Sequence, residues 1–403
     1  MTKIEEAPRF DPRLSAFTQS VADMANPQKI YHDKAANVRA ERIDGVVHLY
    51  RQADIVAINR HPAVLGTGGR GGSFGHDGKL IPLEIDGSDH KKWRRLLDPM
   101  FSPKQVVRLE DSVRGLAREL IDKFAEEGKA DLAEDFSVPL PCLTFLRLLG
   151  APVEDLDFFL EFKDGVIHPK GDTMEEQGEH MAAAGAKLMG YFNDFLAKRR
   201  AAPEKGDDVI GALLTAEVDG EPLNEFDLLN ILFLFMFAGL DTVTSSMSCT
   251  FAWLAQHPDE LKRLVDDPSL IPAAVEEIMR YESPVPSGMR YADDEIDLGD
   301  GLVIHKGEAM HPIWAAGNVD PNAYPDPLTV DFSRRPNHIV FASGTHRCLG
   351  SHLARLEMRL AVEEMLKRIP TFSIAPDEKL IYDNVAVRNV VYLPIVFEPS
   401  TSE

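Results

Sequence analysis

The segment FASGTHRCLGSHLAR, residues 341–355, places a single cysteine, Cys348, in a glycine-punctuated loop ahead of an amphipathic stretch. Gly344 and Gly350 permit turn conformations and close approach of the backbone. The stretch that follows, LGSHLARLEMRLAVEEMLKRI, has helical periodicity, so Cys348 is predicted to lie at a helix N-terminus. There the helix dipole and free N–H groups stabilise a thiolate, which acts either as a nucleophile or as a metal ligand.

Other interpretations of this cysteine remain open at this point. Cysteine is also a common small buried hydrophobe. A zinc site needs about four ligands, and beyond His346, Cys348 and His352 the chain offers no CxxC or HxxxH cluster. A histidine-assisted cysteine nucleophile is chemically feasible, but it leaves the features described next without a role.

Four basic side chains provide donors for an anionic group. His90 and Arg94 lie four residues apart in HKKWR and therefore share one helix face. Arg290 follows the segment SPVPSGM, and His346 precedes the cysteine by two residues. Each alone is typical of a surface residue. Together they supply four donors for a dianionic group, such as the two propionates of a buried haem.

The longest predicted helix has Asn224 as its N-cap and ends near residue 256, before HPDEL. About 32 residues at 1.5 Å each would reach roughly 48 Å. The middle of this helix is hydrophobic nearly all round, which predicts a central, buried position. Its apolar run LLNILFLFMFAGL, residues 228–240, is broken only by Asn230.

An acid and an alcohol stand side by side in the middle of this helix. Asp241 and Thr242 closely follow Ala238 and Gly239. An unpaired buried acid is costly, and glycine weakens a helix by about 1 kcal/mol relative to alanine. Thr242 alone is explained by a hydrogen bond to its own helix, but the buried acid beside it is not. We therefore expect this pair to have a function.

A second acid and base pair, Glu277 and Arg280 in EEIMRYESP, has i, i+3 spacing. The ExxR pattern also occurs at Glu6/Arg9 and Glu260/Arg263, so the spacing by itself is weak. Only the pair at 277 and 280 ends a helix just before the β-patch that carries Arg290. We therefore assign it a structural role.

Composition predicts a soluble protein. The 403 residues are 44% hydrophobic and 27% charged, and the formal net charge of −22 argues against nucleic-acid binding. Three cysteines without paired spacing fit a reducing cytoplasm. The N-terminus has no apolar leader, and the longest apolar run falls short of the roughly 18 residues that span a bilayer. We expect a cytoplasmic protein without a membrane anchor.

The pattern along the chain is mainly helical, with β-rich parts near residues 45–85, 290–305 and 370–397. We find no repeat and no linker, so a single domain over 1–403 is expected. The sequence GTGGRG at 66–71 matches the dinucleotide-binding pattern GxGxxG, but SFGHDGKLIPLE after it is not helical. A mobile loop is the better interpretation.

These segments together resemble the cytochrome P-450 superfamily. FASGTHRCLG is similar to its haem-binding signature, AGLDT to its oxygen-groove motif, and EEIMR to its ExxR motif. DGSDHKKWRRLLDPMF resembles the helix that clasps a haem propionate, and NVDPNAYPDPLTVDFSRRPN the meander before the cysteine. The matches occur in the family order over roughly residues 45–397. One departure is Ala342, where many members carry glycine.

The resemblance implies a mainly α fold with small β-sheets, in which haem b lies between the long central helix and the cysteine-loop helix. It makes Cys348 the thiolate ligand of the haem iron, which favours O–O cleavage, and Asp241 and Thr242 the pair that delivers protons. The loop near 66–80 would gate access. Predicted cofactor contacts are Cys348, His90, Arg94, Arg290, His346, Ala238, Gly239, Phe341 and Gly350. The predicted substrate lining is Leu234, Phe237, Ala238, Val285, Pro286, Ser287, Val385 and Val387.

The implied activity is insertion of one oxygen atom from O2 into a small-to-medium hydrophobic molecule, by hydroxylation or dealkylation. The resemblance also implies electrons from NAD(P)H through a reductase and a ferredoxin, and we expect a monomer. A peroxygenase using hydrogen peroxide and a non-catalytic haem protein are the alternatives, and neither would need the acid and alcohol pair.

We further expect a basic patch for an acidic ferredoxin, formed by Arg347, Arg355, Arg359, Lys92 and Arg95.

Overall fold

The computed structural model describes residues 25–66, 78–202, 206–384 and 387–400. As predicted, helices dominate and the sheets are small. The helices are α2 Gln28–Asn37, α3 Gln52–Arg60, α4 Gly87–Leu97, α5 Pro103–Val106, α6 Glu110–Asp122, α7 Pro139–Leu149, α8 Leu156–Ile167, α9 Met174–Ala201, α10 Val209–Leu214, α11 Glu225–Gln256, α12 Pro258–Asp266, α13 Ile271–Glu282, α14 Trp314–Asn318 and α15 Ser351–Arg368.

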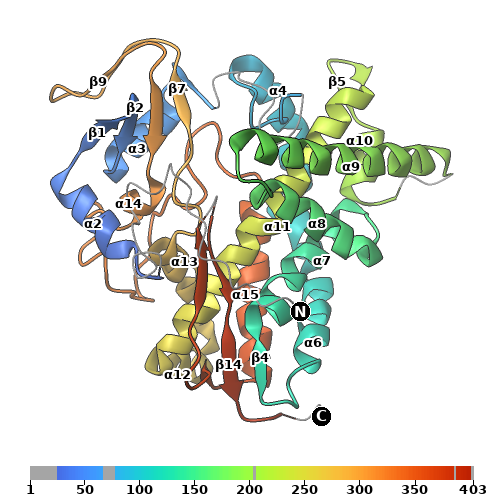
Figure 1. Cartoon of the computed structure of the whole chain (residues 1–403), viewed down its shortest axis with the longest axis vertical. Coiled ribbons are helices and arrows are strands. Elements are labelled where there is room, and N and C mark those ends of the chain that lie inside the picture. Colours follow the sequence, from blue (N-terminus) through green and yellow to red (C-terminus); the bar gives the residue numbers. More distant parts are fainter. Residues whose placement is uncertain (1–24, 67–77, 203–205, 385–386, 401–403) are drawn as a thin grey trace.

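The largest sheet has the strand order β1-β2-β10-β7-β3 and lies beside α2, α3 and α14, at the left of Figure 1. A second sheet, β11-β14-β4, joins the C-terminal part to residues 129–131, which lie outside the predicted β-rich parts. The strands are β1 Ala40–Ile43, β2 Val46–Leu49, β3 Val64–Leu65, β4 Lys129–Asp131, β5 Glu217–Val218, β6 Glu221–Pro222, β7 Arg290–Ala292, β8 Ile296–Asp297, β9 Val303–Ile304, β10 Ala309–Pro312, β11 Phe372–Ile374, β12 Ile381–Asn384, β13 Arg388–Tyr392 and β14 Pro394–Phe397.

Helix α11 is the long helix that the sequence predicts, with the predicted bounds. The Asn224 side chain caps it by accepting a hydrogen bond from the Asp227 N–H at 2.8 Å. By length and composition alone α11 could cross a membrane. Most of its residues are instead buried against α7, α8, α9, α13, α15 and strand β13 (Figure 1), so it is the central core helix.

The side chains of Glu277 and Arg280 are completely buried and lie 2.8 Å apart at the end of α13. Arg280 also donates to the main-chain oxygens of Asn318 and Pro327, at 2.7 and 2.9 Å. The pair therefore ties α13 to the end of α14 and to the segment that leads toward the cysteine loop, because a buried charge is stable only when it is paired and hydrogen-bonded.

Candidate active site

The cysteine loop is closed by main-chain hydrogen bonds. The Cys348 N–H donates to the Phe341 oxygen at 2.9 Å. Gly344 has φ +71°, and a Cβ atom there would lie 1.8 Å from the main-chain oxygen of Asn59, so only glycine fits. Gly350 differs from the expectation, because its φ of −80° is an ordinary helix-entry angle and a Cβ atom would meet no described residue.

Cys348 is the only one of the three cysteines with an accessible side chain. Cys142 and Cys249 are buried, and burial raises the pKa of both thiols to about 12. Burial also raises the pKa of Cys348, while the Gly350 N–H and the nearby Arg94 lower it. A side chain that is closely surrounded by protein and still accessible is typical of one that lines an internal space. Only Cys348 is therefore placed to bind a ligand.

The ring of His90 on α4 lies against that of His346, with 4.3 Å between ring centroids. His90 is 2% exposed, and neither of its ring nitrogens has a hydrogen-bond partner among the described residues. Burial lowers the pKa of His90 to about 4, so the ring is neutral at neutral pH. It retains one N–H group that has nothing to donate to.

Arg290, the first residue of β7, is also buried without an anion. Its guanidinium donates to the Met289 main-chain oxygen at 2.7 Å and lies over the Trp314 ring, 5.7 Å from the ring centroid. No carboxylate forms an ion pair with it in the part of the chain that the structure describes, and burial lowers its pKa to about 10. Because an uncompensated buried cation is costly, this position favours an anionic ligand.

The other two predicted donors already have protein partners. Arg94 donates to Asp98 at 2.6 Å and to the Arg347 main-chain oxygen at 2.7 Å, and so links α4 to the cysteine loop. The His346 Nε2 lies 2.8 Å from the carboxylate of Asp86. Sequence reasoning missed Asp86, because it lies 260 residues from His346 and no local pattern links the two.

The middle of α11 has an accessible stretch within an otherwise buried helix. Ala238 is exposed, and Gly239 and Thr242 are half-buried. The Thr242 hydroxyl donates to the Ala238 main-chain oxygen at 3.0 Å. Packing also constrains Gly239, because a Cβ atom there would lie 2.7 Å from the ring of Phe145 on α7. Its small size serves helix packing.

Asp241 is buried, with an exposure of 4%. Its carboxylate lies 3.7 Å from the ammonium of Lys163 on α8, which also contacts Asp164 at 3.2 Å. Burial raises the pKa of Asp241, and Lys163 opposes that rise. Burial lowers the pKa of Lys163, but Asp241 and Asp164 outweigh it and the net shift is upward. Lys163 therefore remains a cation beside an acid that holds its proton more tightly than usual.

Comparison with known proteins identifies the family. A cytochrome P-450 family model matches residues 172–386. Cytochrome P-450 CYP107DY1 of Priestia megaterium is 34% identical over 78% of this chain and 76% of its own length. The steroid C26-monooxygenase of Mycobacterium tuberculosis is 30% identical over 93% of this chain and 92% of its own length. The chain belongs to the cytochrome P-450 family.

Solved structures agree with this assignment. The cytochrome P-450 PksS of Bacillus subtilis aligns with a TM-score of 0.83 and 28% identity, covering 94% of this chain and 99% of its own. The myxobacterial cytochrome P-450 CYP267B1, solved with myristic acid, has a TM-score of 0.85 and 28% identity, covering 96% and 99%. The protein therefore has the predicted cytochrome P-450 fold and is an oxygen-incorporating oxidoreductase of this family, which uses a haem-thiolate cofactor.

The residues present fit such a cofactor. The chain supplies one accessible thiol at Cys348 and, among the described residues, a buried cation without an ion pair at Arg290 and a ring without a hydrogen-bond partner at His90. Propionates would provide the missing anionic partners. In the part of the chain that the structure describes, the stretch of α11 around Ala238 is accessible, which leaves room beside that helix.

The predicted substrate lining remains a prediction, and the structure describes seven of its eight residues. Phe237, Val285, Ser287 and Val387 are half-buried, as a lining requires. Ala238 is exposed, and Leu234 is buried in the hydrophobic core, with an exposure of 7%. Pro286 is buried, and its main-chain oxygen accepts a hydrogen bond from the Ala315 N–H. Val385 lies outside the described residues.

The expected basic patch is wrong for three of its five cations, because they are neutralised within the chain. Arg355 pairs with Glu276 at 2.6 Å. Arg359 pairs with Glu110 and Glu363, at 3.1 and 3.0 Å, and Lys92 with Asp219 at 2.7 Å. Glu363 lies four residues after Arg359 on α15, whereas Glu276, Glu110 and Asp219 come from segments far away in the sequence, which local spacing did not show. Among the described residues, only Arg347 and Arg95 of the five form no ion pair.

Proposed function

We propose that this cytochrome P-450 hydroxylates or dealkylates a small-to-medium hydrophobic molecule, with Cys348 as the thiolate ligand of haem b. The observation that carries the proposal is the contrast among the three cysteines. Two are buried, with the pKa raised to about 12, whereas Cys348 is accessible at the entry to α15. A haem bound there supplies the activation of oxygen for the family's reaction.

The cofactor would be held by donors of two kinds. His90 has no hydrogen-bond partner among the described residues, and Arg290 has only the Met289 main-chain oxygen as acceptor, so both would receive the propionates directly. Arg94 and His346 are oriented by Asp98 and Asp86 and would contribute their remaining N–H groups. Phe341, Gly350, Ala238 and Gly239 would contact the ring.

Asp241 and Thr242 would deliver protons to the oxygen side of the site. The Thr242 hydroxyl lies at the accessible stretch of α11, where it donates a hydrogen bond to the main-chain oxygen of Ala238. Asp241 holds its proton more firmly than an ordinary aspartate because it is buried, and Lys163 limits that effect. Since Lys163 also contacts Asp164, whose side chain is 62% exposed, these three groups lead from solvent to α11.

The substrate would be apolar, because the half-buried lining of Phe237, Val285 and Val387 offers no charge. The relatives include a protein named for the C26 oxidation of steroids and one solved with myristic acid. Both ligands are hydrophobic. We therefore place the substrate among hydrophobic molecules of this size range, such as a steroid, a fatty acid, a terpene or a substituted aromatic.

Electrons would arrive from NAD(P)H through a reductase and a ferredoxin, in the cytoplasm, to a monomeric enzyme. The ferredoxin would dock near α15, and its binding would depend on Arg347 and Arg95. These are the two cations of the expected patch that form no ion pair among the described residues. Exposed charges act mainly on the rate of encounter and are screened beyond about 8 Å at physiological salt. We therefore expect the rate of reduction by ferredoxin to depend only modestly on salt concentration. Arg347→Glu should slow reduction by ferredoxin, and Arg359→Glu would also disturb internal pairs.

The carbon monoxide complex of the reduced protein tests the ligand assignment. The wild type should show the strongly red-shifted Soret band of thiolate ligation, and Cys348→Ala should lose it. Cys249→Ala is the matched control and should keep the band, because Cys249 is buried. An unshifted band in the wild type, or a retained one in Cys348→Ala, would rule out the assignment.

A second experiment separates the monooxygenase from the peroxygenase and from a non-catalytic haem protein. Turnover of a substrate library is compared with ferredoxin and reductase, and with hydrogen peroxide alone. The proposal expects reductase-driven turnover, with Thr242→Ala consuming NAD(P)H without matching product. Turnover with peroxide alone would support the peroxygenase, and no turnover under either condition the non-catalytic protein.

A further inference from the structure

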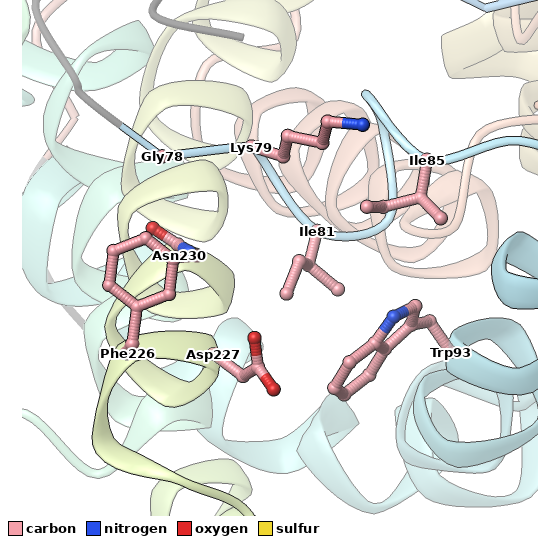
Figure 2. Close-up of a pocket in the computed structure, with 8 residues that line it drawn as sticks. All are labelled: Gly78, Lys79, Ile81, Ile85, Trp93, Phe226, Asp227 and Asn230. Atoms are coloured by element: carbon pink, nitrogen blue, oxygen red, sulfur yellow. The ribbon is translucent and has the colours of Figure 1, made fainter. Parts of the chain in front are cut away.

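A cavity of about 540 Å³ lies between the first turns of α11, helix α4 and the segment 78–85 (Figure 2). This volume suits a small organic molecule. The cavity shares no residue with the predicted haem contacts or the predicted substrate lining. Its lining is Gly78, Lys79, Ile81, Ile85, Trp93, Phe226, Asp227 and Asn230.

Asn230 is the unexplained residue of this cavity. It is the only polar residue in the apolar run 228–240, and its exposure is 1%. Its Oδ1 has no hydrogen-bond partner among the described residues. A buried polar group without a partner costs about 1–3 kcal/mol, and a leucine in this place would cost nothing of this kind. The amide therefore points to a ligand rather than to packing.

The chemistry of the lining indicates the kind of ligand. A hydroxyl group both donates and accepts, so it can satisfy Asn230 in either orientation of the amide. Ile81, Trp93 and Phe226 provide apolar walls for the rest of the molecule. The carboxylate of Asp227 disfavours an anion, and Figure 2 shows the ammonium of Lys79 directed away from that carboxylate.

The cavity is close to the candidate active site. Asn230 and Phe237 are seven residues apart and so lie on one face of α11, about 10 Å from each other. Trp93 directly precedes Arg94 on α4. A molecule hydroxylated beside Phe237 would therefore meet Asn230 two helical turns away.

We propose that this cavity is a second ligand site, which binds an apolar molecule through a hydroxyl group at Asn230, and that its occupant is the hydroxylated product. Binding of an alcohol rests on the cavity alone. The identity of the occupant rests on the proposed function, because hydroxylation, or dealkylation of an ether, gives an apolar substrate the hydroxyl group that Asn230 can bind. The site would thus distinguish product from substrate.

Methyl NMR of isoleucine-labelled holoenzyme as the reduced carbon monoxide complex tests the binding. Cyclohexanol and methylcyclohexane are titrated as probes of matched shape. The Ile81 and Ile85 methyl signals should shift saturably with cyclohexanol, and at least about tenfold more weakly with methylcyclohexane, which corresponds to roughly one hydrogen bond. Asn230→Leu should weaken cyclohexanol binding about tenfold and leave methylcyclohexane unchanged or tighter.

The buried Leu232, which does not line the cavity, provides the matched control. Leu232→Met should keep the preference for cyclohexanol. Equal affinities for the two probes, no saturable shift, or an unchanged preference in Asn230→Leu would overturn the proposed site. The titration needs bound carbon monoxide but not thiolate ligation, so it remains readable if the Cys348 assignment fails.

Product inhibition tests the occupant. With any substrate that is turned over, added product should inhibit the wild type, and the inhibition constant should rise about tenfold in Asn230→Leu, equivalent to about 1.4 kcal/mol. The substrate-induced spin shift should not change, because the cavity is separate from the predicted lining. If cyclohexanol binding is lost in Asn230→Leu but product inhibition is unchanged, the site takes an external alcohol and the product assignment is overturned.

Discussion

Removal of the ammonium beside Asp241 is the most direct perturbation of the predicted proton route. Lys163 lies 3.7 Å from the Asp241 carboxylate, and its side chain is 11% exposed. In Lys163→Met the volume is largely kept and the charge is lost. Asp241 would then keep only the weaker influence of His168 as a cation, so its pKa, already raised by burial, should rise further.

The size of that rise follows from the distance between the two groups. At 3.7 Å two unit charges interact by about 4 kcal/mol at an effective dielectric of about 20, and by about 1 kcal/mol at about 80. Loss of the ammonium removes this favourable interaction with the ionised carboxylate, so the pKa of Asp241 should rise in Lys163→Met. The acid limb of the pH–rate profile should move upward by the same amount if Asp241 must ionise during turnover.

Stability should change with pH in a defined direction. The folded-state pKa of Asp241 is higher in Lys163→Met than in the wild type. Below the wild-type value Asp241 is protonated in both proteins, so it causes no difference between their unfolding free energies. The variant's deficit in unfolding free energy then grows as pH rises through that value. It levels off above the variant's own pKa at about 1–4 kcal/mol.

The assay combines product formation as a function of pH, the carboxylic C=O band in infrared difference spectra, and chemical denaturation at several pH values. Lys163→Arg keeps the charge and should behave like the wild type. Lys187→Met removes an exposed ion pair with Glu161 and should change stability by less than about 1 kcal/mol at every pH. A pH–rate profile of Lys163→Met that coincides with that of the wild type would refute the reasoning.

Three other substitutions have defined outcomes. Ala342 has φ +53°, so Ala342→Gly should raise the thermal midpoint of the holoenzyme by relieving up to about 1 kcal/mol of strain, and an unchanged midpoint would contradict this. Arg280→Met leaves the buried Glu277 with Arg334, at 2.9 Å, as its remaining ion-pair partner and should cost up to about 3–5 kcal/mol in denaturant unfolding, and an unchanged free energy of unfolding would contradict this. Burial lowers the pKa of His168, but its hydrogen bond to Asp383 outweighs burial and the net shift is upward. This pair stabilises the fold below about pH 6.5 and loses that effect as pH rises through the raised pKa, so the thermal midpoints of wild type and His168→Gln should converge in alkali.

The sequence predicted the elements that carry the site because their signals are local. Periodicity and the Asn224 cap predicted α11 with its observed bounds, and the glycine pattern around Cys348 predicted a loop that enters a helix. Gly344 illustrates the strength of such a signal, since its backbone angle and its contact with Asn59 admit no side chain. Motif order then sufficed for the family.

The partners of the charged groups were decided only by the tertiary structure. The Lys163 contact with Asp241, the Asp86 contact with His346 and the pairing of Arg355 with Glu276 each join segments 78 to 260 residues apart, beyond the reach of helical spacing. The same is true of Gly239, whose size is set by Phe145 on a neighbouring helix. By itself the sequence determined the helices, the cysteine loop and the family, because these depend on neighbours along the chain. The protonation of Asp241, the net charge near α15 and the unpartnered amide of Asn230 depend on neighbours in space, which only packing brings together.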